Sequence, residues 1–434
     1  MPDAEASTRR RRTRRPHRTW RQRAAITGGS IVSALLVVSA CAVWYVDSWY
    51  AGIDRITIVH ASPTTDSTVA GAPGTALAAG PGQAPADTTT TEPYLGPSKA
   101  MNVLLTGSDG RSCVDPDSPY AGAFLANGSD TGDRSDTIIL LHLDPSTKQL
   151  ALLSFPRDLY VPIAGGTRRD RINSAFKVED PNPLIQTVES VFGVHIDHYI
   201  GVDFCAFKAL VDATGGISIP FEFPARDLHT GLDVPDVGCH AMGGDEALAY
   251  VRSRYYEYKN ENGRWIDDGS SDYGRIARQQ DFIRRLAAHA LDKGATNPLT
   301  AKRLLDVAHD NNVRIDDDLS LTDLIRLARA IRDLGPENAA SYRVEGLGQS
   351  IGGASVIVPD LTSSTAKGIL AVFRGQKPAD VATTTTTKPK AKSGTTTTAA
   401  DSAAPPDTSP APTEPTTVPN NMRGVYPPTD TSCH

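Results

Sequence analysis

The 434-residue sequence has few of the features that mark the simplest classes of protein. Its five cysteines are too few for a disulfide-dense scaffold, and their spacing fits neither zinc-finger nor CxxC patterns. It has no collagen repeat, Walker loop, serine-hydrolase elbow or zincin motif, which argues against those classes. Hydrophobic residues make up only 39% of the chain, so part of it is expected to stay unfolded.

Charge is unevenly distributed along the chain. Lysine and arginine number 44 against 50 acidic residues, for a formal net charge of −6. Residues 1–23 hold nine arginines and two acidic residues, a net of +7, which leaves −13 for the remainder. A body of that charge would repel a phosphate backbone, and the short basic arm has no helix-turn-helix, so we expect no nucleic-acid partner.

A stretch without charged residues follows these arginines. Residues 24–46 number 23, enough to cross a hydrocarbon core of about 30 Å at about 1.5 Å per residue. The upstream arginines predict a cytoplasmic N-terminus. Small residues before Cys41 are compatible with a lipoprotein signal, but the apolar run continues past Cys41, which favours an uncleaved signal-anchor. We expect a single-pass protein of the cell membrane with an extracytoplasmic main domain.

Disulfides are permitted outside the cytoplasm. Cys113, Cys205 and Cys239 lie in the body of the chain and Cys433 near its end, and spacing alone does not identify the pairs. Cys205 begins an expected helix and Cys239 lies just before another. We therefore predict a Cys205–Cys239 disulfide, with Cys113 free or paired with Cys433. Closing that loop would contribute about 3–4 kcal/mol in the chain-entropy model.

Composition divides the extracytoplasmic part into a linker, a folded domain and a tail. Residues 47–98 and 376–434 are rich in Thr, Ala and Pro, so most of each is expected to be disordered. In residues 99–375, strand-like and helix-like segments alternate, which predicts an α/β or α+β sandwich. The expected strands are 101–106, 137–143, 150–155, 198–202 and 217–221, with a short one within 50–60. The expected helices are 183–192, 204–213, 245–251, 275–291 and 321–334.

Two other patterns are less informative. His195, Asp197 and His198 invite a metal interpretation, but in an extended segment His198 faces away from the other two, so three convergent ligands are not expected. The glycine-rich residues 346–353 lack a lysine partner, and we interpret them as a turn.

Carboxylates and arginines gather at the ends of the expected strands. Asp109 follows the first strand, Arg134 and Asp136 precede or begin the second, and Arg157 follows the third. Any one of these arginines alone is best interpreted as a solvated or structural side chain. Arginines converging with two carboxylates instead suit a diphosphate with a divalent cation, because guanidinium groups bind phosphate bidentately and carboxylates bind Mg²⁺.

More arginines follow later in the chain. Arg252 and Arg254 alternate in a stretch that we expect to be extended, so that both would point the same way. Arg275 and Gln279 are one turn apart on an expected helix, with Arg278 beside them.

At these residues the chain resembles the LytR–CpsA–Psr family of cell-envelope glycopolymer ligases, in its actinobacterial form. The matching segments cover nearly all of residues 100–285 in the right order. They are NVLLTGSDGR (102–111), RSDTIILLHLDP (134–145), ALLSFPRDLYVPI (151–163), RINSAF (171–176), IDHYIGVDFCAFKALVDATGGI (196–217), GDEALAYVRSR (244–254) and DYGRIARQQDFI (272–283).

The resemblance implies an α/β/α sandwich around a central mixed sheet, with a deep apolar pocket for a polyprenyl tail. It implies that Asp109 and Asp136 hold Mg²⁺, or Mn²⁺ in its place. The residues that it assigns to the diphosphate are Arg134, Arg157, Arg252, Arg254, Arg275 and Gln279. Asp109, Asp136, Arg134 and Arg157 are then the candidate catalytic residues.

The implied reaction moves a glycopolymer from a polyprenyl-diphosphate carrier onto peptidoglycan. An acceptor hydroxyl attacks the sugar-proximal phosphorus, polyprenyl phosphate leaves, and a phosphodiester remains. Asp109 or Asp136 would accept the proton. The alternatives are a diphosphatase that uses water as acceptor and a non-catalytic, polyprenyl-lipid-binding regulator of the envelope.

Two insertions depart from the family pattern, residues 110–133 and 255–274. Both are expected at the mouth of the site. In the second, Tyr255, Tyr256, Tyr258 and Trp265 either stack on sugar rings or belong to a surface loop without function.

Overall fold

The computed structural model describes residues 48, 50–61, 99–110, 113, 115–125, 135–310, 313–335, 338–376, 421–422 and 433. The predicted span at 24–46 and the predicted diphosphate ligand Arg134 lie outside these residues. Among the residues described, no helix is long and apolar enough to cross a membrane. The chain separates into a unit of residues 1–52 and a unit of residues 53–434, and all the elements below belong to the second.

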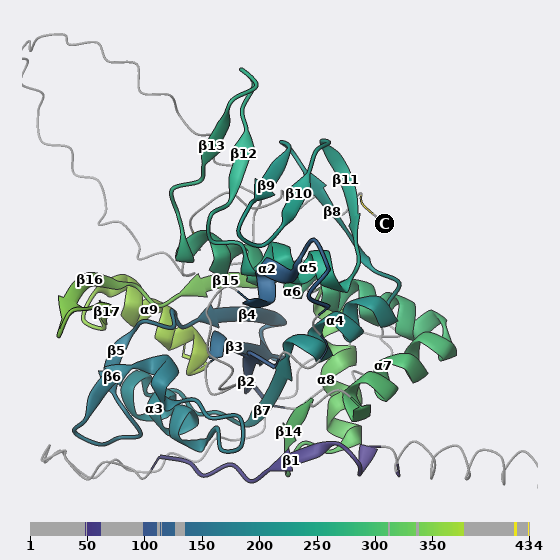
Figure 1. Ribbon diagram of the computed structural model, residues 1–434. Coiled ribbons are helices and arrows are strands. Elements are labelled where there is room, and N and C mark those ends of the chain that lie inside the picture. Colours follow the sequence, from purple (N-terminus) through teal and green to yellow (C-terminus); the bar gives the residue numbers. More distant parts are fainter. Residues whose placement is uncertain are drawn as a thin grey trace, which may run out of the picture. The chain divides into compact units, whose positions relative to one another are not determined.

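A mixed sheet forms the centre of this unit (Figure 1). Among the described residues its spatial order is β1 (Asp54–Ile56), β14 (Arg314–Asp316), β7 (His198–Asp203), β2 (Met101–Ser108), β3 (Ser135–Asp144), β4 (Gln149–Ser154) and β15 (Ala340–Arg343). β2 runs parallel to β7 and antiparallel to β3, whereas β4 runs antiparallel to β3 and parallel to β15. The mixed central sheet is confirmed.

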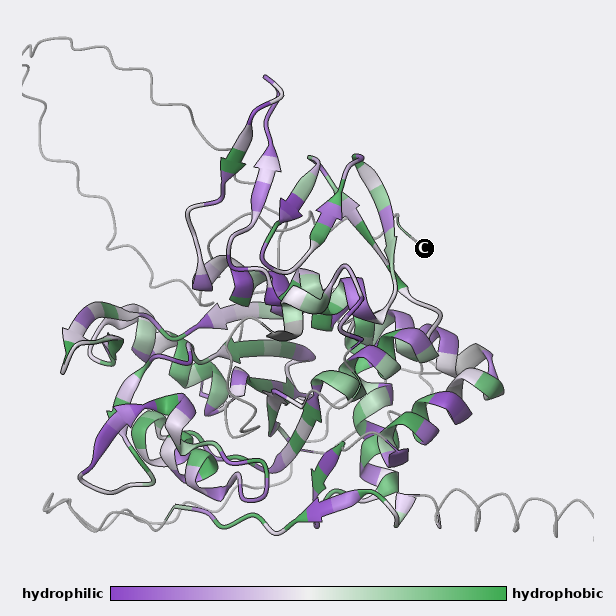
Figure 2. Cartoon of the chain, viewed as in Figure 1, coloured by the Kyte–Doolittle hydropathy of each residue, from purple (hydrophilic) through white to green (hydrophobic). Residues whose placement is uncertain are grey.

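Both faces of the sheet are buried, because successive side chains of a strand point to opposite sides. Along β3, Ile138 and Leu140 join one hydrophobic cluster, and Ile139 and Leu141 join another. Helices α3 (Asn182–Phe192) and α9 (Ser364–Phe373) contribute to the first cluster, and α6 (Asp272–Thr296) and α8 (Leu321–Leu334) to the second. Figure 2 shows hydrophobic residues along the central strands and mixed colouring on the helices around them. The result is a layered α/β/α arrangement.

Smaller elements complete the unit. The remaining helices are α2 (Ala121–Leu125), α4 (Phe204–Ala213), α5 (Gly244–Arg252), α7 (Pro298–Asp310) and the 3-10 helix η1 (Ile172–Ala175). A second sheet has the order β10 (Leu232–Val234), β9 (Ala225–Asp227), β12 (Glu257–Lys259) and β13 (Trp265–Asp267). The paired strands are β8 (Ile217–Phe221) with β11 (Gly238–Met242), β5 (Tyr160–Pro162) with β6 (Arg169–Arg171), and β16 (Gly346–Ile351) with β17 (Ala354–Pro359).

Every strand and helix expected from the sequence is present, although α6 is longer than expected. Two local interpretations were wrong. Arg252 is the last residue of α5, so it does not alternate with Arg254 along an extended stretch. Residues 346–353 are a strand and the turn of a hairpin, with only Gly352 and Gly353 at positive φ. The sequence did not predict helices α2, α7 and α9, the 3-10 helix η1, or strands β5, β6 and β9 to β17.

The predicted Cys205–Cys239 disulfide is wrong. Cys113 is bonded to Cys205, and Cys239 to Cys433. The first pair follows from the sheet, because β2 and β7 are parallel neighbours and end at the same edge, which brings the segment after β2 to the start of α4. The second pair joins Cys433 to β11. Asn421, also from the C-terminal region, accepts a hydrogen bond from the Arg343 amide (2.9 Å) and donates one to the Arg343 carbonyl (3.0 Å).

Candidate functional site

One edge of the central sheet collects the predicted carboxylates. β2 and β7 end there, and antiparallel β3 begins there. Asp109 follows β2 directly, and Asp136 is the second residue of β3. Arg157 lies just beyond β4, whose last residue, Ser154, pairs with Ile139 of β3. Segments distant in sequence therefore supply one cluster.

Arg252 lies between the two carboxylates. Its Nη1 donates to Asp109 Oδ1 at 3.0 Å, and its Nη2 is 3.7 Å from Asp136 Oδ2. Arg157 Nη1 donates to the other oxygen of Asp136, Oδ1, at 2.5 Å. The guanidinium of Arg252 also stacks on Phe204, with Cζ 4.2 Å from the ring centroid. Phe204 begins α4, so this helix helps to fix Arg252.

Helix α6 brings Arg275 and Gln279 to the same cavity, and Asp272 connects Arg275 to Arg254. Arg275 Nη2 is 2.6 Å from Asp272 Oδ1, and Arg254 Nε is 3.5 Å from the same oxygen. Arg275 is buried, and its Nε and Nη2 make no hydrogen bond of acceptable geometry among the described residues. Such a buried guanidinium still has donors to offer to an anion.

Positive charge dominates the electrostatics of the cluster. Burial alone would raise the pKa of Asp136, but Arg275, Arg157 and Arg252 outweigh it and lower this pKa to about 2. The pKa of Arg252 is lowered by burial, against the opposing effect of Asp136 and Asp109. That of Arg254 is lowered by burial and then by Arg275. Arginines this crowded favour an anion with several oxygens.

An apolar cavity of about 330 Å³ adjoins the cluster. Asp136, Arg252, Arg275 and Gln279 line it together with apolar side chains. These come from α4, α5, α6 and α7 and include Phe207, Leu210, Leu248, Phe282, Leu286, Ala287, Ala290 and Leu304. One cavity therefore offers charged groups to an anion and a hydrocarbon-like wall to an apolar chain.

The donors present are compatible with a divalent cation. Asp109 and Asp136 supply carboxylate oxygens from adjacent strands, and both carboxylates contact the same guanidinium, that of Arg252. Mg²⁺ and Mn²⁺ accept one or two carboxylates, with phosphate oxygens and water completing the coordination. These two aspartates would hold the ion.

The structure brings together six of the eight predicted site residues directly around the cavity and its carboxylates: Asp109, Asp136, Arg157, Arg252, Arg275 and Gln279. Arg254 joins through Asp272, and Arg134 lies outside the described residues. Sequence reasoning missed Asp272 and Phe204. The i,i+3 spacing of Asp272 and Arg275 was a usable signal for the first, whereas nothing in the sequence placed Phe204 under Arg252.

The aromatic insertion forms the β12–β13 hairpin and the segments that flank it. Tyr256 is only 3% exposed, and Arg278 lies over its ring at 4.3 Å, so the expectation that it stacks on sugar is wrong. Trp265 stacks against Arg226 at 4.1 Å. Tyr255 is 56% exposed and packs beside the His229 ring, with centroids 4.1 Å apart.

Comparison with known proteins identifies the family. The model of the LytR_cpsA_psr family matches residues 81–367. The "Probable cell wall biosynthesis protein LcpB" of Corynebacterium glutamicum is 36% identical over 194 residues, which are 44% of this chain and 42% of that protein. The "Polyisoprenyl-teichoic acid--peptidoglycan teichoic acid transferase TagU" of Enterococcus faecalis is 31% identical over 213 residues, 48% of this chain and 64% of the relative. The chain thus matches less than two thirds of either relative.

Among solved structures, the crystal structure of B. subtilis TagV superposes with a TM-score of 0.49 at 24% identity, covering 65% of this chain and all of that one. A LytR-Csp2A-Psr enzyme from Actinomyces oris superposes with a TM-score of 0.47 at 22% identity, covering 66% and 92%. Because the family model spans more than half of the sequence, the chain belongs to the LytR_cpsA_psr family.

Proposed function

We propose that this protein is a phosphotransferase that moves a glycopolymer from a polyprenyl-diphosphate carrier onto peptidoglycan. The observation that carries the proposal is the position of Arg252, Arg275 and Asp136 in the wall of an apolar cavity. A lipid diphosphate needs a cationic surface and an apolar surface at once, since its headgroup is anionic and its tail is hydrocarbon. Relatives named as teichoic acid transferases to peptidoglycan support the same class of reaction.

In this mechanism the arginines bind the diphosphate and keep it oriented. Arg157, Arg252 and Arg275 would neutralise the charge that develops on the phosphoryl oxygens as the acceptor hydroxyl attacks. The bond from the sugar-proximal phosphorus to the bridging oxygen breaks, and polyprenyl phosphate leaves. The products are that lipid and a glycan–peptidoglycan phosphodiester.

The acceptor hydroxyl must lose its proton. Asp136, with a pKa of about 2 and several arginines around it, is a weak base. Asp109 contacts Arg252 across the same cluster and is the other carboxylate that could receive the proton. A Mg²⁺ or Mn²⁺ held by Asp109 and Asp136 would add Lewis-acid stabilisation of the diphosphate.

The site is proposed to lie outside the cytoplasm, on a domain tethered to the cell membrane by residues 24–46. Two disulfides in the described residues support an oxidising compartment. A membrane tether would hold the cavity near a lipid-borne donor.

The test uses the full chain in detergent with a radiolabelled polyprenyl-diphosphate glycan, with and without peptidoglycan. Label attached to peptidoglycan, together with released polyprenyl phosphate, is expected. Arg252→Ala should abolish attachment, and the exposed Arg326→Ala, which pairs only with Asp323 among the contacts described, is the matched control.

The other outcomes distinguish the alternatives. Release of the glycan without attachment, at the same rate with and without peptidoglycan, would identify a diphosphatase. Binding without turnover would identify a lipid receptor. Either result would overturn the transferase proposal.

A further inference from the structure

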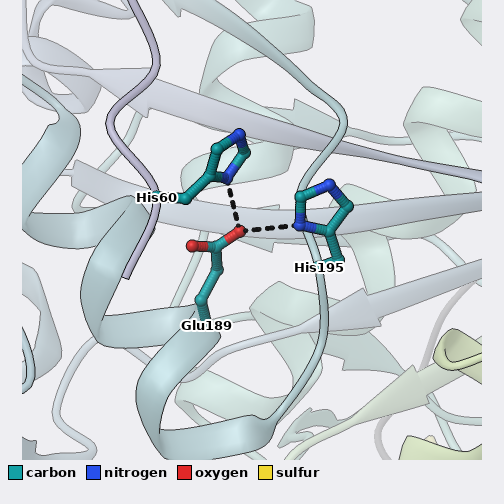
Figure 3. A group of neighbouring side chains, drawn as sticks. All are labelled: His60, Glu189 and His195. Atoms are coloured by element: carbon teal, nitrogen blue, oxygen red, sulfur yellow. Dashed lines mark hydrogen bonds and ion pairs between the residues drawn. The ribbon is translucent and has the colours of Figure 1, made fainter. Parts of the chain in front are cut away.

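A second group of chemically active side chains lies away from the arginine cluster. Figure 3 shows His60, Glu189 and His195 converging, with both imidazoles directed at the same carboxylate. His60 Nδ1 is 2.9 Å and His195 Nδ1 3.3 Å from Glu189 Oε1. The three candidate ligand atoms all lie within 4.8 Å of one another.

These distances suit a small transition-metal ion. Zn²⁺ binds imidazole nitrogen and carboxylate oxygen at about 2.0–2.2 Å in tetrahedral geometry, so neighbouring ligand atoms stand about 3.3 Å apart. One of the two nitrogen–oxygen separations, 3.3 Å, equals that value, and the other, 2.9 Å, is 0.4 Å shorter. Two imidazoles and one carboxylate also form a donor set that zinc accepts, with water in the fourth position.

The surroundings hold the three ligands in place. Glu189 is fixed by backbone amides, because its Oε2 accepts from Ala61 at 2.8 Å and its Oε1 from Ile196 at 3.1 Å. Its side chain is only 8% exposed, so this carboxylate is partly desolvated, whereas both imidazoles remain accessible. An ion could therefore enter from solvent and meet a preorganised anionic ligand.

His195 also has an outer partner. Its Nε2 is 3.8 Å from Asp197 Oδ1, and the other oxygen of Asp197 accepts from the Asn102 amide at 2.7 Å. A carboxylate behind a metal-bound imidazole orients the ring and strengthens it as a ligand. Gly193, at φ +61°, ends α3 in the left-handed conformation and turns the chain so that His195 returns to Glu189.

The cluster lies at one end of a polar stripe on α3. Asn182, Gln186 and Glu189 share a face of the helix, and each binds the segment of residues 57–61. Asn182 accepts from the Val59 amide (2.7 Å) and donates to the Thr57 carbonyl (3.0 Å). Gln186 donates to the Val59 carbonyl at 3.1 Å. The segment that continues from β1, residues 57–61, is thus laid along the helix, and His60 is next to its last described residue.

We propose that His60, Glu189 and His195 form a Zn²⁺ site that fastens residues 57–61 to α3. The site joins three separate pieces of chain: residues 57–61, helix α3 and the turn before β7. It is independent of the proposed transfer reaction, since none of its ligands lines the cavity. The bound metal would add to the hydrogen bonds by which α3 already holds residues 57–61.

Zinc binding to the full, tag-free chain tests the proposal. The metal-free protein is dialysed against Zn²⁺ with excess Mg²⁺, which is added to compete for the carboxylates of the arginine cluster, and bound zinc is counted per chain. We expect one more Zn²⁺ in the wild type than in the His60→Gln/His195→Gln double variant. The matched control is His309→Gln, an exposed histidine beside Asp310, and it should bind as the wild type does.

Further measurements test the role of each proposed ligand and of Asp197. Co²⁺ in the wild type should give visible absorption typical of nitrogen and oxygen ligands in a four-coordinate site, and Glu189→Gln should lose it. Asp197→Asn should weaken zinc binding by about tenfold while leaving the ligands in place. Zinc should also raise the midpoint of thermal unfolding in the wild type and His309→Gln but not in the double variant.

Equal zinc stoichiometry in the wild type and the double variant would overturn the site. So would a wild-type Co²⁺ complex without that absorption, a measurement that needs no variant to fold. Zinc binding that leaves the exposure of residues 57–61 to limited proteolysis unchanged would overturn the fastening role.

Discussion

Arg252 Nη1 donates to Asp109 Oδ1 at 3.0 Å while its Nη2 faces Asp136 at 3.7 Å. One guanidinium thus bridges the two carboxylates that the resemblance assigns to a metal. The same side chain lines the apolar cavity. Arg252 therefore lies where three parts of the proposed site meet: the arginines that would bind the diphosphate, the carboxylates that would bind the metal and the apolar wall that would bind the lipid.

Arg252→Ala is expected to abolish transfer, and Arg252→Lys to restore it only weakly. Lysine keeps the charge but cannot make two parallel contacts with a phosphate or with two carboxylates. Each lost charge-assisted contact is worth about 1.5–3 kcal/mol, or roughly ten- to more than a hundred-fold in rate if it acts in the transition state. Initial rates of glycan attachment measure the effect.

Arg254→Ala belongs in the same series, because Asp272 links Arg254 to Arg275 of the cluster. We expect transfer to be lost there as well. Normal turnover by both alanine variants, with the fold retained, would show that the diphosphate site is elsewhere.

Sequence analysis could predict most of this cluster because sheet topology decides it. Strands that end at one edge bring Asp109, Asp136 and Arg157 together whatever fills the loops between them. The contribution of α5 was harder to predict. Arg252 and Arg254 alternate in the sequence as they would on a strand, but Arg252 ends a helix in which the five preceding residues, 247–251, are all buried.

Other features depend on contacts that no local pattern records. The pairing of Cys113 with Cys205 depends on β2 and β7 being neighbours. Similarly, His195 lies beside His60 and Glu189, which are distant in sequence, whereas the nearby His198 hydrogen-bonds to Asp316 at 3.1 Å. Long-range topology must be known before such partners can be named.

Asp136→Asn is expected to reduce activity while preserving the shape of the side chain. The change removes negative charge from a proposed metal ligand, so higher Mg²⁺ should recover part of the rate. EDTA should silence the wild type and change the weakened variant little. Rates measured across a Mg²⁺ titration check this, and a variant with wild-type Mg²⁺ dependence would remove Asp136 from the metal site.

The lowered pKa of Asp136 predicts how stability depends on pH. A carboxyl that titrates near 2 in the folded state and near 3.8 when unfolded stabilises the fold fully above pH 3.8, and this contribution is lost as pH falls to about 2. It amounts to about 2 kcal/mol. Urea unfolding of the wild type and Asp136→Asn at pH 7, 4 and 2.5 measures it. Between pH 4 and pH 2.5 the free energy of unfolding should fall further in the wild type than in Asp136→Asn. An equal fall in both would contradict the assignment.

The disulfide pairing predicts which thiols are recovered after proteolysis. Non-reducing peptide maps should contain Cys113 linked to Cys205 and Cys239 linked to Cys433. Cys113→Ser should lower the free energy of unfolding by about 2–5 kcal/mol, because the bond closes a loop of about 92 residues in the unfolded chain. Recovery of a Cys205–Cys239 peptide would contradict the observed pairing.

The last prediction concerns the apolar wall of the cavity. Ala287→Trp places a large ring where Ala287 lines the space of about 330 Å³, so it should exclude a polyprenyl tail. The neighbouring Ala288 is on the same helix but does not line the cavity, which makes Ala288→Trp the matched control. Affinity for a long-chain polyprenyl diphosphate should fall at least about tenfold, or 1.4 kcal/mol, in the first variant only. Affinity for a short, soluble diphosphate should stay unchanged in both, since the arginine cluster is untouched. If Ala287→Trp binds the long-chain lipid as tightly as Ala288→Trp does, the tail lies elsewhere and the cavity is not its binding site.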